Sequence, residues 1–151
     1  MHNQKQQHDE PNPSQYISLA IDILTANSRL EHFISVLLKK FGLTLPQFNA
    51  LKVLSLYHPE PLALKKLTEH MIDKSSNTSR LVDKLAEKQL VQREFLPNDR
   101  RVLHVSITET GSKLANECMD LLESNLRTKF NQDELNATQK LIDELKRSQK
   151  L

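Results

Sequence analysis

The sequence contains few of the residues that build disulfides or metal centres. Only one of its 151 residues is a cysteine, Cys118, so an intrachain disulfide is excluded and a thiolate zinc site is disfavoured. The six histidines include no pair four positions apart and none beside the cysteine, so we expect no metal site. This cysteine usage suits a reducing compartment, and the cytoplasm is the expected location.

Long apolar runs and catalytic signatures are missing as well. No apolar run approaches the roughly 18 residues of a membrane span, and the polar first residues lack the apolar region of a signal peptide. Glycine occurs only twice, and the sequence has no glycine-rich phosphate loop, no nucleophile elbow and no Cys/His signature. We therefore expect a protein that is not an enzyme, has no cofactor and does not enter membranes.

The residues that are abundant favour helix. Leucine, lysine, glutamate and glutamine lose little rotamer freedom in a helix, and they fill long stretches of this chain. A length of 151 residues suits one domain with its own core. Residues 1–13 are polar with two prolines and predict a disordered tail, which leaves residues 14–151 as the single domain.

Helical periodicity marks both ends of this domain. Apolar residues recur every three or four positions over 16–41, which predicts one long helix of about 39 Å that stops at Gly42. Near the other end, Thr108 is placed to cap a long helix and Asn131 to begin a last one. A small lobe cannot cover this much apolar surface. We therefore expect residues 14–42 and 108–147 to form the interface of a homodimer.

Residues 44–107 have the pattern of a DNA-binding lobe. The segment predicts a helix capped by Thr44, an extended piece at 62–64, helices at 65–71 and 75–89, and strands at 90–95 and 102–107 joined by a charged turn. A short helix, a turn, a polar-faced helix and a hairpin, in that order, make a winged helix-turn-helix. The predicted fold is mainly α with a small β-hairpin wing.

The side chains of the second helix and of the hairpin turn suit nucleic acid. Short hydroxyl and amide groups at a helix start can approach base edges, and arginine can contact phosphate or guanine or enter a minor groove. Residues 62–107 carry nine Lys/Arg against six Asp/Glu, so the positive excess lies in this lobe. The candidate DNA contacts are Ser75, Ser76, Asn77, Ser79, Arg80, Lys84, Arg100 and Arg101, with Asp99 expected to orient one guanidinium.

Each feature also has an ordinary structural explanation. A polar helix face is usually only solvated, arginine at a hairpin tip discourages edge pairing, and Lys84 equally suits a pair within its own helix. Cys118 lies on an apolar helix stripe, where a buried and inert thiol is expected. A winged-helix dimer that serves as a protein-interaction adaptor, without sequence-specific DNA binding, therefore remains the alternative function.

Three runs of the sequence resemble the MarR (multiple antibiotic resistance regulator) family. They are the stretch 67–85 with its Arg-Leu-Val-Asp-Lys-Leu end, the Asp-Arg-Arg of 99–101, and the stretch 105–111 that ends in Thr-Glu-Thr-Gly. The resemblance covers residues 16–147 in element order. It implies a homodimeric repressor that binds a palindromic operator in double-stranded DNA and is released by a small molecule or by oxidation.

The resemblance also bears on individual residues. It implies that the candidate contacts in the helix and hairpin occupy groove-reading and wing positions. It implies a ligand cleft between the dimer helices and the DNA lobe, for which the expected lining residues are Phe33, Leu37, Phe48 and Tyr57. Ile72 departs from the pattern, since many relatives have glycine in this turn, and a β-branched residue is poor at positive φ.

Overall fold

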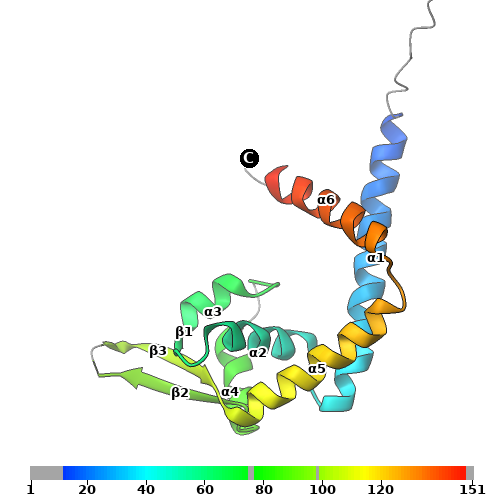
Figure 1. The fold of residues 1–151 in the computed structure, drawn as a ribbon. Coiled ribbons are helices and arrows are strands. Elements are labelled where there is room, and N and C mark those ends of the chain that lie inside the picture. Colours follow the sequence, from blue (N-terminus) through cyan, green and yellow to red (C-terminus); the bar gives the residue numbers. More distant parts are fainter. Residues whose placement is uncertain (1–11, 75–76, 98, 149–151) are drawn as a thin grey trace, which may run out of the picture.

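The fold consists of helices around a small antiparallel sheet (Figure 1). A computed structural model describes residues 12–74, 77–97 and 99–148. The elements are α1 (Pro13–Leu38), η1 (Lys39–Phe41), α2 (Leu45–Tyr57), β1 (Leu62–Ala63), α3 (Leu64–His70), α4 (Thr78–Glu87), β2 (Val91–Leu96), β3 (Asp99–Ile107), α5 (Glu109–Arg127) and α6 (Gln132–Ser148). The predicted class, mainly α with a small winged-helix sheet, is confirmed.

The elements divide into a lobe, formed by α2, α3, α4 and the strands, and an arm, formed by α1, α5 and α6. Figure 1 shows α2, α3, α4 and the strands gathered in one lobe, from which α5 runs toward α1 and α6. The upper half of α1 extends well beyond this lobe. The arrangement separates the segment predicted to bind DNA from the helices predicted to form the dimer.

The caps define where the long helices begin and end. Asn12 accepts a hydrogen bond from the backbone N–H of Ser14 at 3.2 Å, and Pro13 follows in the first turn, so α1 begins just before the predicted start. The predicted stop is confirmed, because the chain tightens into η1 and Gly42 takes a left-handed φ of 65°. The predicted tail, apart from its last two residues, lies outside the described residues.

The predicted capping boxes are present. The backbone N–H of Gln47 donates to Thr44 Oγ1 at 3.4 Å, and that of Thr44 donates to Gln47 Oε1 at 3.1 Å. Asn131 and Glu134 exchange the same two bonds at 2.9 Å each. Each pair satisfies two backbone donors that a helix start leaves without partners.

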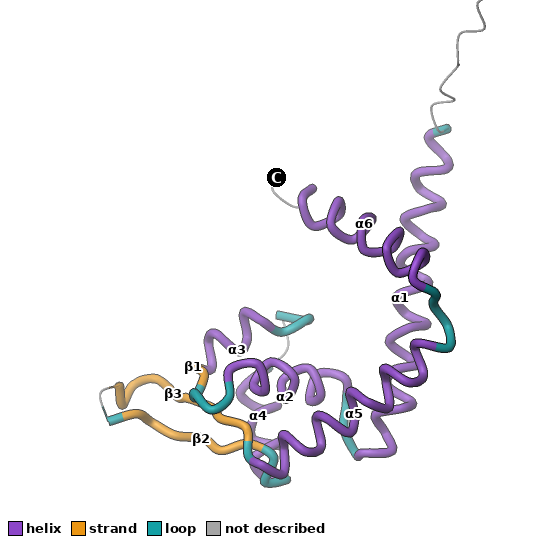
Figure 2. The backbone as a smooth tube through the Cα atoms, viewed as in Figure 1, coloured by secondary structure: helices purple, strands orange, loops and turns teal. Residues whose placement is uncertain are grey.

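The sheet differs from the predicted hairpin in two ways. It has three strands in the order β1-β3-β2 (Figure 2), because the two-residue β1 pairs with β3 through Leu62 and Val105. This strand lies within the extended piece predicted at 62–64, and only its pairing with β3 was not predicted. The hairpin is also longer than predicted: β3 begins at Asp99, which pairs with Leu96. Arg100 and Arg101 are therefore strand residues, although Asp-Arg-Arg is typical of a turn.

The core joins the lobe to the base of the arm. Its completely buried side chains come from α1, α2, α3, α4, β3 and α5, and they include Leu38, Leu51, Leu67, Leu85, Val105 and Cys118. A core built from six elements fixes how α4 and the strands lie relative to α2 and α5.

The start of α5 docks on the turn that follows α4. Thr108 caps α5 by accepting from the N–H of Gly111 at 2.9 Å, while its own hydroxyl donates to the carbonyl of Gln89 at 2.8 Å. The carbonyl of Leu90 accepts from the N–H of Thr108 at 3.1 Å. A Cβ at position 111 would overlap this Leu90 carbonyl oxygen and lie 2.9 Å from its carbon. Only glycine permits this approach of the two backbones.

Gly111→Ala should lower the free energy of unfolding by about 1–3 kcal/mol, because the new methyl group must displace backbone atoms. An alanine in an unhindered helix would instead stabilise it by up to about 1 kcal/mol relative to glycine, so the sign of the change is diagnostic. Urea denaturation measures it. Asn116→Ala, at an exposed site of the same helix, is the control and should change stability little. A stabilised Gly111→Ala protein would contradict the close approach.

Candidate nucleic-acid interface

Helix α4 divides into a buried and an exposed face. Val82 and Leu85 have no exposed surface and pack into the core, whereas Ser79, Arg80 and Lys84 are exposed. The spacings of Val82 with Leu85 and of Arg80 with Lys84 follow the helical repeat. Packing therefore presents Arg80 and Lys84 to solvent one turn apart, with Ser79 on the neighbouring part of the exposed surface.

The start of α4 differs from the predicted one. The helix was expected to begin at Ser75, but Asn77 is its N-cap and Thr78 its first residue. Asn77 Oδ1 accepts from the backbone N–H of Arg80 at 3.1 Å. This bond engages the oxygen that pairing with adenine would need. The other two candidates of this run, Ser75 and Ser76, lie outside the described residues.

The wing lies beside α4 and carries the remaining candidates. Arg101 is an exposed residue of β3. Asp99 and Arg100 occupy the first two positions of the same strand. That Asp99 orients a guanidinium stays a prediction.

An ion pair that the sequence analysis missed connects the wing to α4. Arg93 of β2 donates to the carboxylate of Asp83 on the helix. Both side chains are partly exposed, so the pair contributes little to stability, but it joins the two elements that carry the candidate DNA contacts. No spacing rule relates two residues on different elements, and only the fold brings them together.

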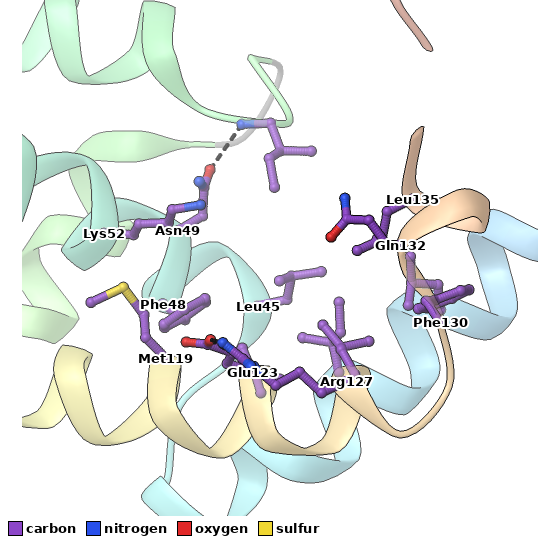
Figure 3. A pocket seen from close by; sticks show the side chains of 15 residues that line it. Leu45, Phe48, Asn49, Lys52, Met119, Glu123, Arg127, Phe130, Gln132 and Leu135 are labelled. Atoms are coloured by element: carbon purple, nitrogen blue, oxygen red, sulfur yellow. Dashed lines mark hydrogen bonds and ion pairs between the residues drawn. The ribbon is translucent and has the colours of Figure 1, made fainter. Parts of the chain in front are cut away.

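The turn between α3 and α4 is held from helix α2. Asn49, buried in the lobe, accepts a hydrogen bond from the backbone N–H of Ile72 at 2.8 Å (Figure 3). Among the described residues other than glycine, Gln89 alone has a positive φ. Ile72 therefore does not take the backbone conformation that would disfavour a β-branched side chain, and the expected conflict does not arise.

A cavity of about 940 Å³ lies between this lobe and the arm (Figure 3). Its wall comes from α1, α2, α5, the start of α6 and Ile72, and it is largely apolar with a few polar groups. Arg127 at the wall pairs with Glu123, its Nε lying 2.9 Å from the carboxylate. The wall comprises Leu30, Ile34, Leu45, Phe48, Asn49, Lys52, Ile72, Met119, Leu122, Glu123, Leu126, Arg127, Phe130, Gln132 and Leu135.

One of the four residues expected at a ligand cleft lines this cavity, namely Phe48. Leu37 is buried in the core, and Phe33 packs under the ammonium group of Lys129, 4.8 Å from its ring centre. Tyr57 lines a separate, smaller hollow, where its hydroxyl lies 2.9 Å from Nε2 of His70. The resemblance implied a cleft between the long helices and the lobe, but it did not distinguish the side chains that face the cavity from those that lie elsewhere.

Cys118 is completely buried in the core. Burial, with a smaller contribution from the nearby Glu117 carboxylate, raises the pKa of the Cys118 thiol to about 11. A thiol with this pKa stays protonated at neutral pH and is a poor nucleophile, in agreement with the expected inert role.

Two features are absent from the described residues, a metal-binding cluster and a membrane-spanning helix. No group of three or more metal-ligating side chains gathers in residues 12–74, 77–97 and 99–148. Within the same part of the chain, no helix is both long and apolar enough to span a bilayer.

Comparison with known sequences identifies relatives of the lobe and its surroundings. A family model described as MarR family matches residues 43–103. The regulator SarZ of Staphylococcus epidermidis is 34% identical over 110 residues, which cover 72% of this chain and 70% of SarZ. The regulator MhqR of Bacillus subtilis is 36% identical over 78 residues, 52% of each chain. The chain thus spans about half the length of MhqR in this match.

Solved structures share the fold at lower identity. A MarR-like transcription regulator from Bacillus cereus has a TM-score of 0.78 at 20% identity, covering 89% of this chain and 98% of that one. Reduced AbfR of S. epidermidis bound to DNA has a TM-score of 0.77 at 23% identity, covering 91% and 93%. The family match in the lobe, the identity with SarZ over more than two thirds of both chains and the shared fold agree, and the chain belongs to the MarR family.

Proposed function

We propose that this protein is a cytoplasmic, sequence-specific transcriptional regulator that binds a palindromic operator as a homodimer and represses transcription. The observation that carries this proposal is the exposure of Ser79, Arg80 and Lys84 on α4, together with that of Arg101 on the wing. The relatives SarZ and MhqR are named HTH-type transcriptional regulators, and AbfR was solved bound to DNA. These names support the same function here.

The exposed groups suit two kinds of DNA contact. Helix α4 is the second helix of the helix-turn-helix and the element that would enter the major groove. Arg80 near its start has the planar donor fork that pairs with guanine O6 and N7, while Lys84 one turn later suits a phosphate. Arg101 on the wing suits the minor groove or the phosphates beside it.

The exposed apolar residues of the arm support the homodimer. Large apolar side chains on α1 and α6 are between 38% and 69% exposed, which single solvated helices rarely sustain. They are Tyr16, Ile17, Leu19, Ile21, Leu24, Leu30, Val36, Leu135, Ile142 and Leu145. A second copy that covers them would place two lobes on one duplex. The matching operator has two similar half-sites about one helical turn, roughly 34 Å, apart.

The cavity supports release by a small molecule. Its volume of about 940 Å³ falls within the usual range for ligand pockets. The largely apolar wall suits an apolar molecule, and Lys52 offers a cation for one acidic group, since Arg127 already pairs with Glu123. A ligand that binds the DNA-free arrangement more tightly than the DNA-bound one would weaken operator binding.

Arg80→Ala should reduce the preference for the protein's own promoter DNA over random duplex by about 1–3 kcal/mol, since a bidentate arginine contact discriminates bases by that amount. Fluorescence titration of both DNAs measures the preference. Arg147→Ala removes the same charge on α6, outside α4 and outside the wall of the large cavity, and should leave the preference unchanged. An equal loss in both variants would show that Arg80 acts by charge alone.

Arg101→Ala should make DNA binding less dependent on salt. Each phosphate contact contributes about 0.9 to the slope of log affinity against log salt concentration, so a dimer that loses two contacts should lose about 1.8. Titrations at several salt concentrations give this slope. Arg147→Ala on α6 is the control of equal charge, and an Arg101→Ala slope that equals the control slope would refute the phosphate contact.

Replacing two exposed apolar residues of α1 by lysine should yield a monomer. Ile17 and Leu24 are 65% and 69% exposed and lie two helical turns apart, on one face, so two charges there would oppose burial against a second copy. Sedimentation velocity measures the mass. Leu56→Lys, at a 76% exposed site of α2 in the lobe, should remain a dimer. A dimeric Ile17→Lys/Leu24→Lys protein would place the interface elsewhere.

A further inference from the structure

The segment between α3 and α4 precedes the helix that is proposed to enter the major groove, and the structure describes its residues 71–74 and 77. At its two ends, Met71 is buried in the core and Asn77 caps α4. Between them, Ile72 is 73% exposed, so its side chain does little to hold the backbone. Its N–H is held instead by the side chain of Asn49, 23 positions earlier in the chain.

Asn49 is an unusual residue for its place. It is 8% exposed in the middle of α2, between the buried Phe48 and the completely buried Ala50 and Leu51. An amide removed from water costs free energy unless it is hydrogen-bonded, and an apolar side chain of similar size would fill the space without this cost. The hydrogen bond that the amide makes therefore explains its presence: Oδ1 accepts from the backbone N–H of Ile72 at 2.8 Å.

We propose that Asn49 is a positioning residue for DNA reading. Its hydrogen bond ties the backbone at Ile72 to α2 and adds to the core packing of Val82 and Leu85 in holding the orientation in which α4 meets a duplex. The role rests on the proposed function, because it is defined by the DNA contacts of α4. Asn49 itself contacts no base; it acts through the turn.

The test compares variants that keep or remove the acceptor. Asn49→Leu is close in size and has no acceptor, whereas Asn49→Asp keeps an oxygen at the same place. Val53→Ala, at a buried site of the same helix, weakens packing without touching the turn. Two quantities are measured on each full-length protein: the exchange rate of the Ile72 amide proton by NMR, and the ratio of affinities for promoter DNA and random duplex. The ratio cancels the general effect of the charge in Asn49→Asp, because phosphate attraction acts on both DNAs.

For Asn49→Leu, we expect faster exchange at Ile72 and an affinity ratio that falls about tenfold, comparable to the loss of one hydrogen bond. Asn49→Asp should keep the Ile72 amide protected and retain most of the ratio, and Val53→Ala should keep both. Should Asn49→Leu fail to fold, Asn49→Ala removes the acceptor with less added apolar bulk. An unchanged ratio in a folded acceptor-free variant, or an equal fall in Val53→Ala, would overturn the proposal.

The two proposals fail in different ways. A wild-type protein that does not prefer promoter DNA would overturn the proposed function, and with it the role of Asn49 in reading. A wild-type protein that prefers promoter DNA, together with an Asn49→Leu variant that reads it equally well, would overturn the role of Asn49 alone. The exchange rate at Ile72 reports in either case whether the hydrogen bond exists in solution.

Discussion

Helix α2 is the element against which the rest of the lobe is placed. Its residues 47–51, 53 and 54 are all buried, whereas Lys52 and Leu56 are exposed, so the helix packs over most of its circumference and meets solvent along one narrow strip. Its neighbours α1, α3, α4, α5 and β3 pack around it. A closely packed core resists continuous deformation. The orientations of α4 and of the wing therefore depend on this packing and not only on their own sequences.

This constraint explains which parts of the fold the sequence could predict. Caps such as Thr44 and Asn131 act on backbone groups three residues away, and Gly42 ends a helix through its own φ, so local sequence determines them. The start of α4 was predicted wrongly. Serine suits both the first turn of a helix and its N-cap, so the run from Ser75 offers several possible starts, and the structure uses Asn77 as the N-cap. The strand β1 depends on its partner β3, which no local pattern reveals.

The same distinction holds for the candidate site. Helical periodicity correctly separated the buried Val82 and Leu85 from the exposed Arg80 and Lys84. It did not reveal the pair of Arg93 with Asp83 or the bond of Asn49 to Ile72, because both join separate elements. A buried asparagine within an apolar helix was the available signal for the second, since such a side chain needs a partner.

The cavity and the turn that precedes α4 share the side chain of Asn49. The same amide lines the cavity and binds the turn that precedes α4, and Ile72 contributes to the same wall. A molecule in the cavity would therefore contact two residues, Asn49 and Ile72, that are joined by the hydrogen bond at the turn before α4. Any such influence is reciprocal, because a duplex that favours one position of the turn must change the affinity of the cavity by the same factor. The geometry thus places the cavity wall one hydrogen bond from the turn that precedes α4, with α2 as their common support.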